Sequence, residues 1–364
     1  MTVSQLPLRS SFVNVLRKNT LPKPTLLPEN KFAYFQGRAV RRNPPQSIHQ
    51  GYESKLNIQN QQNKTKVGRA LPTTFVFLAS IIWGTTFVTQ KLAGYHMGSF
   101  TFNGIRFALG ALSLLPVIFI LEKNHSARGR HTFLIGLAGG VILFAASNFQ
   151  QFGIILNKNP GSASEAGFIT GLYIVFVPLL GLFMGRKSRP LTWFAAILAF
   201  GGLALISIGP GGLAAIKTSD LMLVLGAVFW AAHILLIDRY VHSVSPLRFT
   251  AIQFAVCAVL SMISALLFET ISLQGLQNGL FPILFGGIFA CGTAYTFQTL
   301  GQREVEPTRA AIIFSLEALF AALSETLFLG ELMTAQKYLG GAVIFIGVIL
   351  SQLPEKRPNA PRTP

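Results

Sequence analysis

The chain has 364 residues, of which 51% are hydrophobic and 12% are charged, and its mean hydropathy is +0.51. This composition excludes a soluble globular protein and indicates a polytopic helical membrane protein. The net charge of +17 does not indicate a nucleic-acid partner, because residues 1–69 alone carry 12 Lys/Arg against two acids. Cys257 and Cys291 lie within apolar runs, which predicts packing roles and neither a disulfide nor a metal site.

Residues 1–69 are predicted to form a disordered basic arm, because apolar runs are few and prolines are frequent there. No short apolar core follows the first charges, so a secretory signal is not expected. Three interpretations stay open: an organellar transit peptide, a segment that touches anionic lipid head groups, and a start site assigned too far upstream.

Ten apolar segments follow the arm, and each is predicted to be a transmembrane helix. The first five run near residues 75–92, 99–121, 132–156, 165–184 and 191–208, and the second five near 220–240, 247–268, 281–301, 308–329 and 335–352. The expected organisation is an arm (1–69), a first repeat (70–210), a second repeat (211–353) and a cytoplasmic tail (354–364).

Lysine and arginine are concentrated on one side of this predicted bundle. Thirteen of them lie at that side, whereas the other side has only Lys91, Lys158, Lys217 and Lys337. Basic residues are retained on the cytoplasmic side of membrane proteins. We therefore expect a multi-pass protein of the inner cell membrane with both termini in the cytoplasm.

The two halves of the apolar region resemble each other. LASIIWGTTF from Leu78 matches LGAVFWAAHI from Leu225 and pairs Trp83 with Trp230, and the same shift aligns Ser99 with Pro246. Farther on, FQQFG matches FQTLG and GLFMGR matches TLFLGE, at nearly constant offset. Because each copy has five spans, an odd number, the second copy must be inverted. The predicted fold class is thus all-α, a polytopic membrane protein with ten transmembrane helices in two inverted five-helix repeats, an architecture common among secondary transporters.

Three runs, LASIIWGTTFV, AGFITGLYIVFVPLLGLFMGR and SLEALFAALSETLFLGE, resemble the EamA domains of the drug/metabolite transporter superfamily. The resemblance covers about Phe75 to Leu353. It implies a ten-helix inner-membrane carrier that exports metabolites, amino acids or drugs by alternating access, often against protons. Such domains often carry a Glu-Pro pair in the ninth span, whereas Ala318 follows Glu317 here. The proline kink is therefore expected to be lost.

Glu317 lies near the middle of the ninth span and is the main candidate for substrate binding or coupling. A carboxylate at that depth costs about 2.5–3.5 kcal/mol on insertion scales, so it is expected to face protein or a water-filled cavity. Ala310, Ala321 and Ser324 share its face, where another helix or a substrate could come close. The alternative is a protonated acid bonded to a neighbouring helix for structure alone.

Further candidates are aromatic and polar residues at membrane depth. Trp83 and Trp230 are predicted as two walls of one cavity, with helix packing as an equal alternative. His233, one turn after Trp230, suits proton coupling, although a structural hydrogen bond is the preferred interpretation. Asn148, Gln150 and Gln298 are predicted to line the cavity or to form interhelical hydrogen bonds.

Three further charged residues lie near the predicted outer side. Arg106 is interpreted as extending toward the membrane surface, in preference to binding an anion. Glu165 is expected to stabilise a helix N-terminus. Glu325 is left open between a structural and a functional role.

These features predict a secondary active transporter, and the resemblance implies an exporter. The expected partners are small-molecule solutes and membrane lipid, and a homodimer is left open. No phosphate-binding GxxxxGK[ST] loop occurs, so ATP is not expected to drive transport, and no cofactor is expected. The alternative is an intramembrane enzyme or lipid-modifying protein that uses Glu317 and His233 as acid and base.

Overall fold

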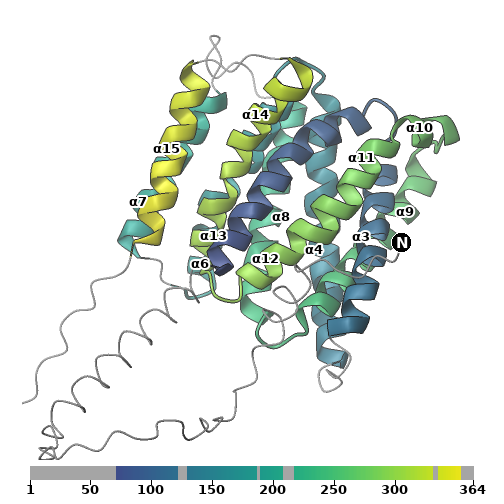
Figure 1. Cartoon of the computed structure of the whole chain (residues 1–364), viewed down its shortest axis with the longest axis horizontal. Coiled ribbons are helices and arrows are strands. Elements are labelled where there is room, and N and C mark those ends of the chain that lie inside the picture. Colours follow the sequence, from purple (N-terminus) through teal and green to yellow (C-terminus); the bar gives the residue numbers. More distant parts are fainter. Residues whose placement is uncertain (1–70, 122–128, 187–188, 208–216, 331–334, 354–364) are drawn as a thin grey trace, which may run out of the picture. The chain divides into compact units, whose positions relative to one another are not determined.

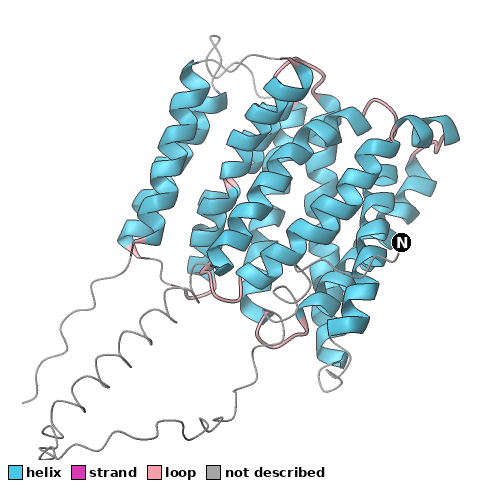
Figure 2. Ribbon diagram, in the orientation of Figure 1, coloured by secondary structure: helices cyan, strands magenta, loops and turns pink. Residues whose placement is uncertain are grey.

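The computed structural model describes residues 71–121, 129–186, 189–207, 217–330 and 335–353, and the predicted arm and tail lie outside these residues. The described residues form helices joined by short loops and turns, with no strand among them (Figure 2). In the first half these are the helix Leu71–Ala93, α3 (Ser99–Leu121), α4 (Gly129–Leu156), α5 (Ser162–Thr170), α6 (Tyr173–Phe183) and α7 (Pro190–Ser207).

The second half follows the same order. Its helices are α8 (Thr218–Tyr240), α9 (Pro246–Phe268), α10 (Leu273–Asn278), α11 (Leu280–Leu284), the π-helix η2 (Phe285–Tyr295), α12 (Thr296–Gly301), α13 (Pro307–Phe314), α14 (Leu316–Leu329) and α15 (Ala335–Gln352). Helices α11, η2 and α12 continue one another as a single span, Leu280–Gly301.

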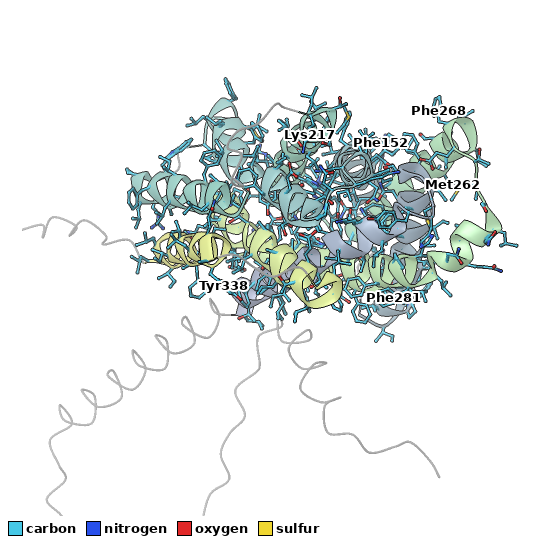
Figure 3. The ribbon with its side chains drawn as sticks, turned by 90° about the horizontal axis from the view of Figure 1, so that it is seen from above. Phe152, Lys217, Met262, Phe268, Phe281 and Tyr338 are labelled. Atoms are coloured by element: carbon cyan, nitrogen blue, oxygen red, sulfur yellow. The ribbon has the colours of Figure 1, made fainter. Side chains whose placement is uncertain are left out.

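The ten predicted spans all correspond to helices of this bundle (Figure 1). Among the described residues, 8 helices are long and apolar enough to cross a membrane. The two shorter apolar helices, Pro190–Leu205 and Tyr338–Ser351, belong to α7 and α15, which pack against each other. Large apolar side chains such as Phe268, Phe281 and Tyr338 point outward from the bundle, as expected for a surface in contact with lipid (Figure 3).

Equivalent helices of the two halves run antiparallel, which is the geometry of an inverted repeat. Glu269, directly after α9, accepts hydrogen bonds from the backbone N–H groups of Phe100 and Thr101 at the start of α3, each at 2.8 Å. In the same way, Gln336 at the start of α15 donates to the carbonyl of Leu205 near the end of α7, at 3.0 Å. The predicted fold class is therefore confirmed.

The helices of spans four and nine are both interrupted partway along the span. Helix α5 ends at Thr170 before α6 begins at Tyr173, and α13 ends at Phe314 before α14 begins at Leu316 (Figure 2). The proline kink was expected to be lost because Ala318 follows Glu317, but the helix of span nine is interrupted just before that acid. Ser315 occupies the break, and its hydroxyl donates to the Ile312 carbonyl at 2.7 Å, a local bond that competes with regular helix.

The first helix packs directly on the break in span nine. A Cβ atom at Gly84 would lie 2.6 Å from the backbone oxygen of Glu317, so only glycine permits this approach. On a neighbouring side, a Cβ atom at Gly167 would lie 3.1 Å from the Cβ of Ala321. The stripe of small residues beside Glu317 thus does bring other helices close, as predicted.

Candidate functional site

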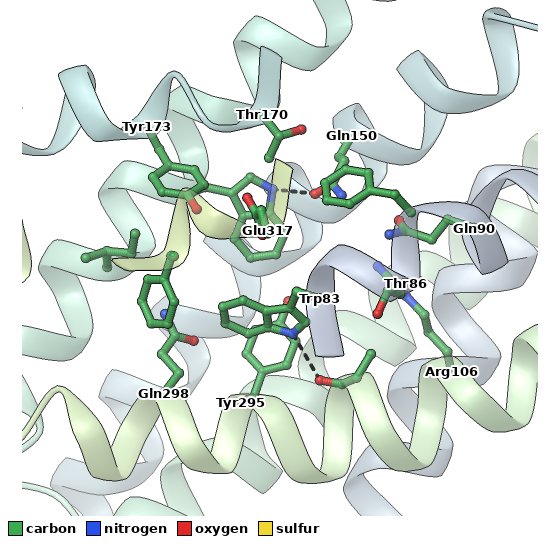
Figure 4. A pocket seen from close by; sticks show the side chains of 15 residues that line it. Trp83, Thr86, Gln90, Arg106, Gln150, Thr170, Tyr173, Tyr295, Gln298 and Glu317 are labelled. Atoms are coloured by element: carbon green, nitrogen blue, oxygen red, sulfur yellow. Dashed lines mark hydrogen bonds between the residues drawn. The ribbon is translucent and has the colours of Figure 1, made fainter. Parts of the chain in front are cut away.

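A cavity lies between the two halves, at the depth of the interrupted helices (Figure 4). About 530 Å³ of space there is not filled by atoms, and part of that space is open to solvent. Seven of the ten spans contribute side chains to its lining, and α7, α9 and α15 contribute none. The lining residues are Trp83, Thr86, Phe87, Gln90, Arg106, Gln150, Thr170, Tyr173, Trp230, Ile234, Ala290, Tyr295, Gln298, Phe314 and Glu317.

Part of this lining comes in pairs that the internal repeat relates. Trp83 pairs with Trp230, and Gln150 with Gln298, in the alignment of the two halves. Both indoles donate a hydrogen bond: Trp83 Nε1 to the Ala290 carbonyl at 3.2 Å, and Trp230 Nε1 to Gln150 Oε1 at 2.6 Å. These bonds cross between the halves, so the repeat-related walls also hold the two halves together.

Aromatic rings surround the indoles. The ring of Tyr295 lies 4.9 Å from that of Trp83 and 6.2 Å from that of Trp230, measured between centroids. Phe314, the last residue of α13, lies 5.2 Å from Trp83. Tyr295 ends the π-helix η2, a conformation that is often found at functional sites. The result is an aromatic box suited to an apolar or aromatic part of a ligand.

Glu317 is the acidic group of the cavity. It lies in the first turn of α14, where the side chain is only 4% exposed. Its Oε1 atom has no hydrogen-bond partner, and neither has the hydroxyl of Tyr173, which lies nearby (Figure 4). A carboxyl group in such a place lacks the hydrogen bonds that water would supply, and a cation or a hydrogen-bond donor from a ligand would replace them.

Other buried polar atoms of the lining are likewise unpaired. Gln90 Oε1, Thr170 Oγ1 and Gln298 Oε1 have no partner, and each belongs to a residue that faces the cavity. Buried polar groups in proteins are nearly always hydrogen-bonded, so a cluster of exceptions needs an explanation. Their convergence on one cavity indicates a place that receives polar ligand atoms or water.

Arg106 is placed differently from the prediction. The guanidinium does not extend toward the membrane surface: the residue is 4% exposed and lines the cavity. Its Cζ atom lies 5.0 Å from the ring centroid of Phe102 and 4.9 Å from that of Phe107. The physical reason is that these two rings hold the cation by cation–π contacts inside the bundle.

Asn148 and His233, two of the seven predicted site residues, do not line the cavity. Asn148 Oδ1 accepts from Asn103 at 2.9 Å, and its amide donates to Ser261 at 3.1 Å, so it joins three helices. His233 is fully buried and its Nε2 lies 2.8 Å from Gln253 Oε1. Asn148 therefore has the interhelical hydrogen bonds that were its alternative, and His233 has the structural hydrogen bond that was its preferred interpretation.

The sequence left the role of Glu325 open, and in the structure its carboxylate is fully bonded to neighbouring elements. Its carboxylate accepts from the backbone N–H groups of Ala163 at 3.1 Å and Ser164 at 3.0 Å, and also from the Ser164 hydroxyl. Lys91 Nζ lies 3.5 Å from its Oε1. Glu165 lies in the first turn of α5, as predicted, and accepts from Asn157 at 2.9 Å.

Sequence reasoning missed most of the aromatic lining. Tyr173, Tyr295, Phe314 and Phe87 were not singled out, because aromatic residues are common in apolar spans and their sequence positions do not show which ones meet. The one available signal was the repeat: Phe87 aligns with Ile234 at the shift that pairs the two tryptophans.

Among the described residues, no three His, Cys, Asp or Glu side chains come together as metal ligands.

Comparison with known proteins agrees with this architecture. The sequence model of the EamA-like transporter family matches residues 71–208 and again residues 217–353. An uncharacterized transporter of Archaeoglobus fulgidus is 28% identical over 299 residues, which cover 81% of this chain and 90% of the relative.

Two bacterial relatives and one solved structure extend the comparison. The uncharacterized transporter YwfM of Bacillus subtilis is 27% identical, with 79% of this chain and 95% of the relative covered. The uncharacterized inner membrane transporter YedA of Escherichia coli K12 is 24% identical, with 76% and 89% covered. A crystal structure that is 18% identical aligns with a TM-score of 0.65 over 78% of this chain and 97% of its own, which shows a shared fold.

Proposed function

Since this chain belongs to the EamA-like transporter family, we propose that it is a secondary active transporter that carries a small organic solute through the cavity by alternating access. The observation that carries the proposal is the cavity itself. It lies between two antiparallel repeats, and it holds a buried carboxyl group with an unpaired oxygen. Export from the cytoplasm across the inner membrane, in exchange for protons, is the direction we propose.

The proposed coupling group is Glu317. Burial disfavours its charged form, so the group binds a proton when the cavity is closed from water. Arrival of a solute or of water at the cavity favours release of that proton. Alternating exposure of one such group to the two sides of the membrane is sufficient to couple solute movement to a proton gradient.

An intramembrane enzyme is the weaker proposal. It would require Glu317 and His233 to face one substrate as acid and base. His233 instead lies outside the cavity lining and is bonded to Gln253. The ring centroids of Trp230 and Tyr295 lie 6.0 and 6.2 Å from the centroid of its imidazole.

The test uses purified full-length protein in liposomes that contain a pH-sensitive dye. A panel of amino acids, organic acids and cationic drugs is added outside, and saturable proton movement is recorded for each. We expect at least one solute to give a signal in the wild type. Glu317→Gln should insert normally but lose proton movement and solute accumulation, because the amide cannot ionise. Glu317→Asp should keep part of the activity with an altered pH optimum.

Glu304→Gln, at an exposed loop residue, is the matched control and should behave as the wild type. If Glu317→Gln drives accumulation with an unchanged pH profile, Glu317 has no coupling role. If the solute leaves the liposomes chemically changed, the protein is an enzyme and the transport proposal fails.

A further inference from the structure

Arg106 is a buried cation without an anionic partner. Its residue is 4% exposed, and its Nε atom has no hydrogen-bond partner. The ion pairs found among the described residues, Lys91–Glu325, Arg186–Asp238 and Lys217–Glu165, do not include it. An arginine at membrane depth normally pairs with an acid or with backbone carbonyls, so its isolation here has a cost that needs a compensating ligand.

The internal repeat shows that the fold does not require a charge at this position. Ser99 aligns with Pro246, so Arg106, seven residues on, aligns with Gln253. Gln253 is neutral and its side chain is bonded to His233 at 2.8 Å. The charge is therefore a departure from the repeat: it is present at Arg106 in the first half and absent at Gln253 in the second.

The surroundings hold the guanidinium in a fixed position. Phe102 and Phe107 flank it through cation–π contacts, and the stem of the side chain packs on the π-helix at Gly286. A Cβ atom at Gly286 would lie 3.3 Å from Arg106 Cδ. Figure 4 shows the side chain directed toward Thr86 and the cavity. A cation fixed in this way is ready to bind an anion with little loss of side-chain entropy.

We propose that Arg106 is the anion-binding residue of the cavity and that the transported solute carries a carboxylate attached to an apolar body. The inference rests on the proposed transport function and names the solute that this site would take. The planar guanidinium matches a carboxylate through two parallel hydrogen bonds. The tryptophans Trp83 and Trp230 provide the apolar walls.

A monoanion fits the charge of the site better than a phosphate. Arg106 is the one cationic side chain in the lining, and Glu317 is acidic. A dianionic phosphate would leave excess negative charge in a medium of low dielectric constant, where it is strongly disfavoured. A carboxylate neutralises Arg106 and leaves Glu317 available for a proton or for a cationic group of the same solute.

The test compares matched ligands on purified full-length protein. The probes are 3-phenylpropionate, its neutral amide, phenyl phosphate and a series of aliphatic monocarboxylates. Binding is measured by tryptophan fluorescence and by the shift in unfolding temperature. In the wild type we expect the carboxylates to bind at least about tenfold more tightly than the amide, since a hydrogen bond to a charged group is lost in the amide.

Three variants separate the charge from its geometry. Arg106→Gln, which places the residue of the second repeat in the first, should weaken carboxylate binding about 10- to 100-fold and leave amide binding unchanged. Arg106→Lys should be intermediate, because lysine keeps the charge but not the planar fork. Arg130→Gln, at an exposed residue at the start of α4, is the matched control and should bind as the wild type.

Two results would overturn the inference: a wild type that binds no carboxylate more tightly than the amide, or an Arg106→Gln protein with wild-type affinity for carboxylates. Tighter binding of phenyl phosphate than of every carboxylate would overturn the choice of anion. The transport proposal fails separately. If the protein binds carboxylates through Arg106 but moves no solute in liposomes, the inference about the binding site holds and the transport proposal fails.

Discussion

At the scale of single residues, the cavity is distinguished by polar atoms that the fold leaves unpaired. Gln90, Thr170, Tyr173, Gln298 and Glu317 each have a buried oxygen without a partner, and all five line the cavity. Trp230 and Gln150 are different, because they satisfy each other at 2.6 Å. That bond joins α8 of one repeat to α4 of the other, so it positions the wall against which a solute would rest.

Trp230→Phe should therefore weaken solute binding without unfolding the protein. The phenyl ring keeps much of the packing, but Gln150 loses the donor that orients its side-chain amide. A neutral hydrogen bond contributes about 0.5–1.5 kcal/mol, so we expect the KM of the transported solute to rise about two- to tenfold. The liposome assay measures this change.

Trp193→Phe is the matched control, because Trp193 lies on α7 and outside the cavity lining. An equal rise in KM for both variants would show that the effect is one of general packing. An unchanged KM in Trp230→Phe would show that the bond does not position the site.

At the scale of elements, the start of α5 depends on a side chain from another helix. Its N-cap is Gly161, at φ 79°, which has no side chain to accept hydrogen bonds from the first turn. Glu325 of α14 accepts them instead, from Ala163 and Ser164. Lys91, at the end of the first helix, pairs with the same carboxylate and also donates to the Asn159 carbonyl at 3.2 Å. Three elements thus meet at one buried ion pair.

Glu325→Ala should destabilise the protein strongly. The change leaves Lys91 buried without its partner and the first turn of α5 without its cap, and breaking a buried pair in this way costs about 3–5 kcal/mol. The measurement is the unfolding temperature in detergent. A double variant, Lys91→Met with Glu325→Leu, should recover part of the loss because no unpaired charge remains.

Glu165→Ala provides the comparison for this pair. Glu165 lies 3.9 Å from Lys217, and the two side chains are 30% and 49% exposed. A partly exposed pair contributes at most about 1 kcal/mol, and the bond from Asn157 contributes about 0.5–1.5 kcal/mol, so this variant should lose clearly less stability than Glu325→Ala. If Glu325→Ala unfolds at the same temperature as Glu165→Ala, the ion pair has no structural importance.

At the scale of the whole molecule, arginines gather at one end of the bundle. Arg130, Arg186 and Arg239 lie at the ends of α4, α6 and α8 that meet there, and His131 lies 3.1 Å from Ser243 at the same end. Lys158 and Lys217 lie at the opposite end. The positive-inside rule predicts that the end with the arginines faces the cytoplasm.

Reporter fusions test that orientation. A reporter that is active only outside the cytoplasm should be inactive when fused after Gly129 and active when fused after Gly212. The reason is that the basic residues resist transfer across the membrane during insertion. A second reporter that is active only inside the cytoplasm should give the reverse pattern. Activity of the first reporter at Gly129 would invert the predicted orientation.

The sequence by itself determined the number of spans and their inverted relation, and it placed their limits to within a few residues. Each helix in lipid must satisfy its own backbone hydrogen bonds, and hydropathy depends only on local composition. The helices 99–121 and 247–268 could therefore be predicted without knowledge of their neighbours. The odd number of spans in each copy then required inversion. Glu317, Trp83 and Trp230 stood out for similar reasons, as an acid and a pair of repeated aromatics at membrane depth.

Tertiary structure alone decided which side chains meet. Arg106 and Asn148 are both polar residues in apolar spans, yet Arg106 lines the cavity while Asn148 joins helices behind it. The break at Ser315 also formed without a proline, where Gly84 of the first helix packs against it. These outcomes depend on the rotation of each helix and on the closeness of its neighbours. Both are set by packing among residues far apart in the chain, and no single span contains that information.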